Sequence, residues 1–260
     1  SPYPIFFALS QKPGKDSSGR SQPDGDYAEI STEFCRFLSI IGLRWADPDW
    51  KNLPISTASY SIVQSDEVAA HSRLDAEYYE PGIRQLHAKV TSASKISLGD
   101  SVYRTVSRFK RESHQDIDYI DISSVDPRTG IPLPVRISAK DAPSRASYLV
   151  NPGDVLVSTV RPDRNIVAFV GQASNCPQVA SNGFCVLRPK TIASEVLFTY
   201  CKTEAFRLLL SRRATATMYP AVTDKDVLDI PLLMPPLAMC KRLTSKMKSV
   251  IQKIEESKRE

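Results

Sequence analysis

The first part of the chain combines one short apolar run with three stretches of helical spacing. Residues 5–9 (IFFAL) form a continuous apolar run with the length of a buried strand. From Asp26 apolar residues recur every three or four positions, and Glu29 follows Asp26 by three residues, as in a capping box. Two further helices are predicted at residues 66–78 and 81–92, with a proline in the first turn of the second. A loop is expected for the Gly-, Ser- and Pro-rich residues 11–25, and a linker or an extended crossing for residues 45–64, which hold two prolines and many Ser and Thr.

From Ile96 onward the pattern changes to short strands separated by turns. Residues 117–122 (IDYIDI) alternate almost strictly, and further strands are predicted at 155–160, 166–170 and 184–187. Proline and glycine mark turns at 126–130 and 151–154, and a helix is expected near 194–211. This order predicts an α+β fold, with a mixed or antiparallel sheet and flanking helices.

The C-terminal end is predicted to be one long charged helix that starts after Pro235 and Pro236. Its apolar residues repeat at intervals of three and four, as in a coiled-coil seam: Cys240, Leu243, Met247, Val250 and Ile254. Two alternatives stay open. The helix lies on its own domain, or it packs against a partner helix or a continuation of the chain.

Composition excludes several classes of protein. Of the 260 residues, 42% are hydrophobic and 24% charged, which is typical of a globular chain and not of a disordered one. The apolar runs are shorter than the roughly 18 residues of a membrane-spanning helix, so no membrane association is expected. Five scattered cysteines without a Cys-x-x-Cys pair argue against a disulfide framework or a zinc site, and favour a cytoplasmic protein. The chain opens at Ser1 directly before an apolar run, and is expected to be a fragment of a longer protein.

Charge divides the chain unevenly. Residues 1–80 hold 7 basic and 12 acidic side chains, whereas residues 81–260 hold 27 basic and 17 acidic ones. The later part therefore carries the positive field expected of a protein that meets a polyanion.

Catalytic motifs are mostly absent from the sequence. It contains no glycine-rich phosphate loop and no Gly-x-Ser-x-Gly element. Residues 47–50 (DPDW) are similar to the Asp-Pro-Pro-Trp signature of amino-methyltransferases, but the second proline is missing. We therefore expect no catalytic residue, no metal and no cofactor in this chain. A nuclease or methyltransferase with an unrecognised site stays as the alternative.

Basic and small polar residues gather in three predicted loops of the later part. Arginine can hold phosphates or guanine edges, asparagine can pair with adenine, and threonine can touch the thymine methyl group. These loops predict binding to double-stranded DNA through Arg104, Arg108, Lys110, Arg111, Arg161, Arg164, Asn165, Arg212, Arg213, Thr215, Thr217 and Tyr219. For Arg212 and Arg213 the alternative is a favourable interaction with a helix C-terminus.

Several stretches of residues 73–260 resemble the target-recognition domain of type I restriction–modification specificity subunits. They occur in order at 73–81 (RLDAEYYEP), 96–100 (ISLGD), 148–156 (YLVNPGDVL), 158–162 (STVRP), 181–189 (SNGFCVLRP) and 230–237 (IPLLMPPL). The resemblance implies a DNA target-recognition domain over residues 61–235 and a spacer helix over 236–260. Such subunits usually carry two recognition domains, whereas this chain contains one and no internal repeat.

Residues 1–60 are similar to the C-terminal tail of an N6-adenine DNA methylase, followed by a linker. The resemblance rests on residues 5–9, on residues 14–20 (GKDSSGR) and on the helix from Asp26. It implies a non-catalytic specificity module of a bacterial defence system, which positions DNA for adenine methylation or cleavage by other modules. S-adenosylmethionine is implied for the parent methylase only. The implied partners are DNA, methylase and restriction modules, and a second copy of the chain through the C-terminal helix. A protein-interaction scaffold that acts through this helix is a further alternative.

Overall fold

The computed structural model describes residues 2–10, 18, 20, 25–43, 60–103, 107–111, 115–171, 174–215 and 219–257. By its internal contacts the chain divides into two compact units, Ser1–Ala88 and Lys89–Glu260. The division into residues 1–60, 61–235 and 236–260 stays a prediction.

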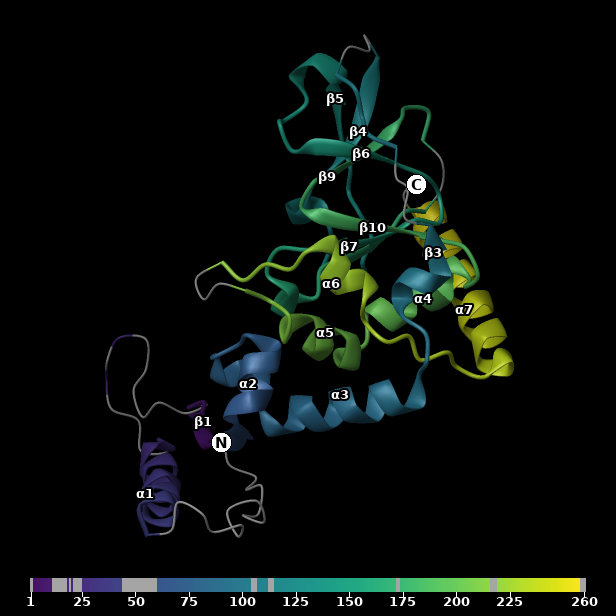
Figure 1. Ribbon diagram of the computed structural model, residues 1–260. Helices are drawn as coiled ribbons and strands as arrows, with labels where there is room; N and C mark the ends of the chain where they lie inside the picture. Colours follow the sequence, from purple (N-terminus) through teal and green to yellow (C-terminus); the bar gives the residue numbers. More distant parts are fainter. Residues whose placement is uncertain are drawn as a thin grey trace. The chain divides into compact units, whose positions relative to one another are not determined.

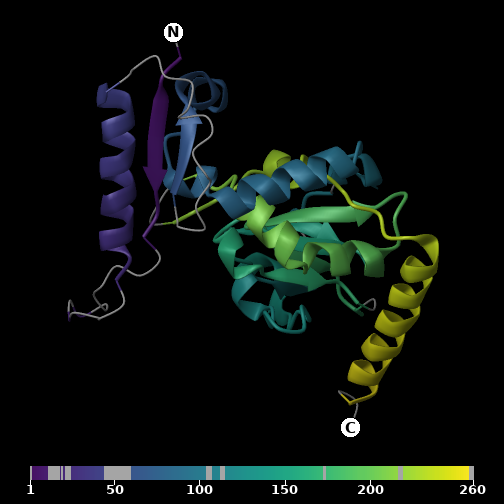
Figure 2. The same ribbon diagram turned by 90° about the horizontal axis from the view of Figure 1, so that it is seen from below.

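The first unit is built on a two-stranded antiparallel sheet of β1 (Pro4–Ala8) and β2 (Tyr60–Gln64). β1 is the predicted strand, and β2 lies at the end of the stretch predicted as a linker or an extended crossing. Helix α1 (Tyr27–Leu43) packs beside β1, with the Phe6 ring centroid 5.4 Å from that of Phe34 and 5.5 Å from that of Phe37 (Figure 2). The strand assignment of β2 follows from pairing with a distant segment, which local spacing does not reveal.

The helix predicted at residues 66–78 is divided. It forms α2 (Ser65–His71) and the 3-10 turn η2 (Ala76–Tyr79), because Ser72 adopts a left-handed conformation with φ of 52° and ends α2. Helix α3 (Pro81–Ala93) begins at its proline, as predicted.

The second unit contains two four-stranded sheets (Figure 1). One sheet has the order β3-β10-β7-β8 and is antiparallel throughout, with strands β3 (Val102–Tyr103), β10 (Phe184–Pro189), β7 (Val155–Ser158) and β8 (Val167–Phe169). The other has the order β5-β4-β9-β6, with β5 (Val135–Ser138), β4 (Asp116–Ile120), β9 (Gln178–Ser181) and β6 (Ala146–Val150). Only the pair β4–β9 is parallel in this described sheet. The predicted α+β fold with a mixed sheet is thus confirmed.

Both sheets contribute side chains to one core. Ile120 and Ala180 from the mixed sheet belong to the same buried cluster as Leu156 and Phe184 from the antiparallel sheet. The chain crosses from one sheet to the other at the turn between β9 and β10. This turn and its neighbours therefore lie on a rigid base of two sheets that share a core.

The helices of the second unit are shorter than the pattern predicted, except for the last. The helix expected at 194–211 is two helices, α4 (Ser194–Cys201) and α5 (Glu204–Ser211), because the Thr203 hydroxyl accepts the Phe206 N–H at 3.2 Å and begins a new helix. A short helix α6 (Asp224–Leu228) follows, and α7 (Leu237–Ser257) begins directly after the prolines. The remaining 3-10 turns are η3 (Leu98–Ser101), η4 (Ile122–Ser124), η5 (Ala139–Asp141) and η6 (Pro162–Arg164).

Helix α7 packs on α4 (Figure 1). Of its seam residues, Cys240, Leu243 and Met247 are half-buried, whereas Val250 is 50% exposed. The first alternative, contact with its own domain, thus holds for part of the helix. A helix long and apolar enough to cross a membrane does not occur among the described residues.

Candidate nucleic-acid interface

Two of the predicted loops meet at residues 159–161 and 220–222. The Arg161 N–H donates to the Pro220 carbonyl at 2.8 Å, and the Val222 N–H donates to the Thr159 carbonyl at 2.9 Å. The guanidinium of Arg161 lies over the ring of Tyr219, with its Cζ atom 5.6 Å from the ring centroid. Because Tyr219 is 67% exposed, this pair offers a positive charge and an aromatic face to solvent.

The turn after Arg161 has an unusual backbone. Arg161 and Asn165 both have a φ of 49° and flank η6. Left-handed residues other than glycine are uncommon, and surrounding structure must hold them. The Asn165 side chain supplies such a hold, because its amide donates to the Lys202 carbonyl at 3.3 Å. Arg164 is exposed at the tip of the turn.

A third predicted loop extends the edge of β6. The Phe109 N–H donates to the Ser147 carbonyl at 2.9 Å, and the Leu149 N–H donates to the Ser107 carbonyl at 2.8 Å. This pairing places the Arg108 Cζ atom 5.7 Å from the ring centroid of Tyr148. Burial raises the pKa of Tyr148. The two arginines Arg108 and Arg161 are therefore held in the same way, each on an aromatic ring.

Backbone hydrogen bonds join these loops in series through the turn between β9 and β10. The Gly183 carbonyl accepts the Thr159 N–H at 2.9 Å and the Thr159 hydroxyl at 3.0 Å. The Asn182 N–H donates to the Arg145 carbonyl at 2.8 Å. We call the four segments 145–148, 159–161, 182–183 and 219–222 the loop row. A Cβ at Gly183 would lie 2.6 Å from Ile122 Cδ1, so a larger residue here would have to displace the end of that side chain.

One carboxyl group lies beside the loop row. Asp224 follows residues 219–222 and interacts electrostatically with Tyr148, which also interacts with Arg108. Partial burial raises the pKa of Asp224, and a hydrogen bond from the Cys185 thiol opposes that shift. A negative charge thus lies within the positive surface.

Other predicted residues contribute to the fold itself. Arg213 donates to the Asp226 carbonyl at 3.2 Å and to the Asp229 carbonyl at 3.1 Å, at the end of α6. Arg212 is 9% exposed, and Arg111 donates to the Pro143 carbonyl at 2.5 Å. The interaction with a helix C-terminus, which the sequence left as an alternative, is thus the role that Arg213 has, although at α6 and not at its own helix.

The remaining predicted residues are placed as follows. Lys110 and Thr215 are exposed, and Thr215 pairs with Ala221 by two backbone hydrogen bonds of 3.0 and 3.1 Å. Arg104 and Thr217 lie outside the described residues. Within the described chain, no group of three or more His, Cys, Asp or Glu residues could hold a metal ion.

Sequence reasoning did not select Tyr148, Arg145 or Asn182 as site residues. Their local signal is weak, because Tyr148 fits a strand and Asn182 with Gly183 fits an ordinary turn. What distinguishes them is their partners, which come from distant parts of the chain.

Neither a protein-family model nor a curated protein matches the sequence. Two similar solved structures cover 63% of this chain and 43% of their own chains. One is the HsdS subunit from Thermoanaerobacter tengcongensis, 29% identical with a TM-score of 0.51. The other, 30% identical with a TM-score of 0.53, belongs to work on the complex assembly and conformational transition of the type I R-M system. This chain spans less than half the length of either protein. The similarity of residues 1–60 to a methylase tail stays a prediction. The resemblance to type I specificity subunits, in contrast, is confirmed by these two structures: the matched part of this chain has the fold of the HsdS specificity subunits of type I restriction–modification systems.

Proposed function

We propose that the second unit recognises a specific sequence in double-stranded DNA, as a specificity module of a restriction–modification protein. The observation that carries the proposal is the loop row, which joins loops from distant parts of the chain and holds Arg108 and Arg161 on aromatic rings. The aromatic ring beside each arginine restricts its guanidinium group before DNA binds. This restriction lowers the entropic cost of binding. The likeness to HsdS structures supports the same function.

The proposed interface consists of Arg108, Lys110, Arg161, Arg164, Thr215 and Tyr219. Phosphate contacts set the affinity and the register, and only contacts with base edges supply sequence preference. Arg104 and Thr217, which lie outside the described residues, stay proposed members on the sequence alone. Arg111, Asn165, Arg212 and Arg213 already have partners in the fold, so we assign them supporting roles.

The wider role is also proposed. The chain positions DNA for adenine-N6 methylation or cleavage by other modules, and does not itself catalyse either reaction. Residues 1–60 would be the tail of a methylase module, and S-adenosylmethionine would bind only to the catalytic part of the parent. Helix α7 is the proposed contact with a partner subunit or a second copy of the chain, and light scattering with and without residues 238–260 tests the second copy.

Selection from a random duplex library, at a stated salt concentration, tests the proposal directly. We expect one enriched sequence and an affinity for it that falls as salt rises, because bound phosphates release counterions. Absence of saturable binding even at low salt would contradict the proposal. Methyl transfer or cleavage by this chain alone would instead favour the enzyme alternative.

A further inference from the structure

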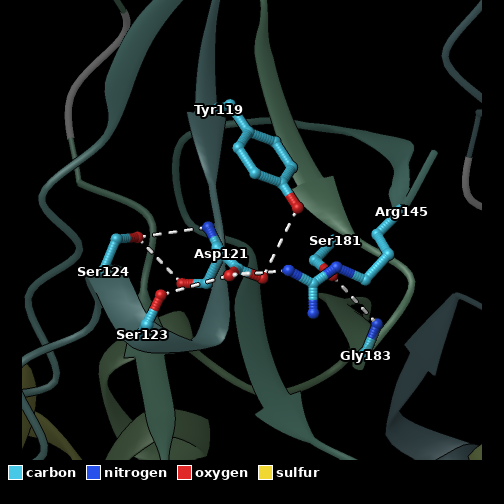
Figure 3. Close-up of polar contacts among 7 residues, drawn as sticks. All are labelled: Tyr119, Asp121, Ser123, Ser124, Arg145, Ser181 and Gly183. Atoms are coloured by element: carbon cyan, nitrogen blue, oxygen red, sulfur yellow. Dashed lines mark hydrogen bonds and ion pairs between the residues drawn. The ribbon is translucent and has the colours of Figure 1, made fainter. Parts of the chain in front are cut away.

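Arg145 stands at one end of the loop row and is held by a carboxylate. Its Nη2 group donates to Oδ2 of Asp121 at 3.4 Å, while the side chain stays 62% exposed (Figure 3). Asp121 directly follows β4, and Arg145 directly precedes β6. The two residues therefore come from ends of strands in the same rigid sheet.

The carboxylate is itself fixed from the protein side. The Ser123 hydroxyl donates to Oδ2 at 3.1 Å, and the Tyr119 hydroxyl donates to Oδ1 at 3.4 Å (Figure 3). Tyr119 is buried, and its ring belongs to a core cluster. A chain of contacts thus runs from the core through Asp121 to the exposed guanidinium of Arg145.

Other arginines of the second unit are bound differently. Arg136 uses both Nε and Nη2 on Asp118, at 2.9 and 3.2 Å, and Arg188 uses the same two groups on Asp154, at 2.9 and 2.7 Å. Such a bidentate pair occupies the fork that would otherwise meet a base or a phosphate. Arg145 binds its carboxylate through one nitrogen, and no other group in the described parts of the chain binds this guanidinium. It is therefore oriented but still able to donate.

We propose that Arg145 reads a guanine in the DNA bound by the loop row, with Asp121 as its positioning residue. The inference rests on the proposed function and adds a specificity-determining residue to it. A phosphate contact depends mainly on charge, and the neighbouring carboxylate weakens the net charge at this place. Recognition of guanine O6 and N7 depends on the direction of two N–H groups, which a fixed partner improves.

The position of Arg145 supports this assignment. Its carbonyl accepts the N–H of Asn182, and the next residue, Gly183, binds Thr159, two residues before Arg161. A duplex lying along the loop row would therefore meet Arg145 and Arg161 from neighbouring segments. The Asp121 oxygens accept and cannot donate, so Asp121 acts on Arg145 and makes no hydrogen bond to guanine O6 or N7, which also only accept.

The experiment uses the whole 260-residue chain and the duplex that it selects. Binding is measured for that duplex and for duplexes in which each base pair is changed in turn, with wild type, Arg145→Ala and Asp121→Asn. For Arg145→Ala we expect the preference at one G·C pair to fall by about 5- to 150-fold, with other positions unchanged. The slope of log affinity against log salt should change by well below the roughly 0.9 that one lost phosphate contact causes.

The Asp121→Asn variant distinguishes recognition of the base from the effect of net charge at Arg145. The amide keeps the shape of the side chain but frees the positive charge of Arg145, so binding to unrelated DNA should be equal or stronger while preference at the same G·C pair falls. Lys190→Ala removes an exposed charge beyond the far end of β10 and should leave that preference intact.

The outcomes distinguish this inference from the proposed function. If wild type selects no sequence, the proposed function fails and the role of Arg145 fails with it. If wild type selects a sequence and Arg145→Ala keeps every base preference, only this inference is overturned. Uniform weakening with a salt slope flattened by about 0.9 would make Arg145 a phosphate contact and would also overturn it. Circular dichroism confirms that each variant is folded.

Discussion

The guanidinium of Arg161 lies on the exposed ring of Tyr219, with 5.6 Å between its Cζ atom and the ring centroid. The two residues belong to loops that are joined by backbone hydrogen bonds between residues 159–161 and 220–222. Neither side chain is anchored in the core, since Arg161 is half-buried and Tyr219 is 67% exposed. The Tyr219 ring therefore restricts the position of the Arg161 guanidinium, and the hydrogen-bonded loops fix the position of the ring.

Substitutions in this pair should affect DNA binding in a graded way. Arg161→Ala removes the charge and should weaken binding to the selected duplex by about 1–3 kcal/mol. Tyr219→Ala removes the ring and should cost about 0.5–1 kcal/mol, which is the usual value of an exposed cation–π contact. Tyr219→Phe keeps the ring and should bind as wild type does, as measured by fluorescence anisotropy.

The control for this series is Lys190→Ala, which removes an exposed charge. Lys190 follows β10 at one end of the antiparallel sheet, and Arg161 follows β7 at the other end. If the Arg161→Ala variant binds the selected duplex with wild-type affinity, Arg161 lies outside the interface.

Asp224 should limit the affinity of the chain for DNA. Its carboxylate interacts with Tyr148, close to Arg108, and repels phosphates. Asp224→Asn should therefore strengthen binding to all sequences alike, on the order of 0.5–1 kcal/mol at low salt and less at high salt.

The same residue predicts a pH dependence. Because burial raises the pKa of Asp224, its carboxyl group takes up a proton at a higher pH than an ordinary aspartate. Wild type should therefore gain affinity as the pH falls toward that pKa, and Asp224→Asn should lack this part of the gain. Equal pH profiles for the two proteins would contradict the assignment.

The sequence predicted the elements whose signal is local. The apolar run in β1, the proline starts of α3 and α7, and strands β4, β7, β8 and β10 of the second unit were found from spacing and turn residues, whereas β3, β5, β6 and β9 were not predicted. The prediction failed where a tertiary contact decides. β2 needs β1 as its partner, and the break between α4 and α5 depends on a single hydroxyl, that of Thr203.

The candidate site was predicted only in part, for a similar reason. Loop arginines are visible in a sequence, but their partners are not. Arg213 and Arg161 look alike as loop arginines, yet one binds the carbonyl groups at the end of α6 and the other lies on Tyr219. Arg145 belongs to no sequence motif. Asp121 lies near it only because β4 and β6 both pair with β9, which the local sequence does not reveal.

Arg213 and Arg164 should give opposite results when each is changed to alanine. Arg213→Ala leaves two carbonyl groups without their charged donor, and should lower the free energy of unfolding by about 1–3 kcal/mol. It should leave the DNA affinity of the folded protein unchanged. Arg164→Ala removes an exposed side chain, so it should leave stability unchanged and weaken DNA binding.

Urea unfolding followed by circular dichroism measures the first quantity, and anisotropy titration measures the second. If the folded Arg213→Ala variant loses affinity for DNA, Arg213 is a DNA contact and not only a part of the fold.

The ion pair of Asp118 and Arg136 should make stability depend on pH. Hydrogen bonds from Arg136 at 2.9 and 3.2 Å lower the pKa of Asp118, and a hydrogen bond from the Ser174 hydroxyl acts in the same direction. Asp118 in the folded chain thus holds its proton less tightly than in the unfolded chain, where its pKa is near the ordinary 3.8. The carboxylate therefore stabilises the fold fully above that value, and this contribution is lost as the pH falls through the lower pKa of the folded state.

Asp118→Asn should remove this dependence. Because Arg136 is 54% exposed and Asp118 only 12%, solvent screens the pair in part, and we expect a loss of about 1–2 kcal/mol at pH 7. The difference between wild type and variant should shrink when unfolding is measured at successively lower pH below about 4. Asp141→Asn changes an exposed carboxylate of the same unit and serves as the control. If the difference in free energy of unfolding between wild type and Asp118→Asn instead stays constant down to the lowest pH measured, the variant loses packing or neutral hydrogen bonds, and not the ion pair.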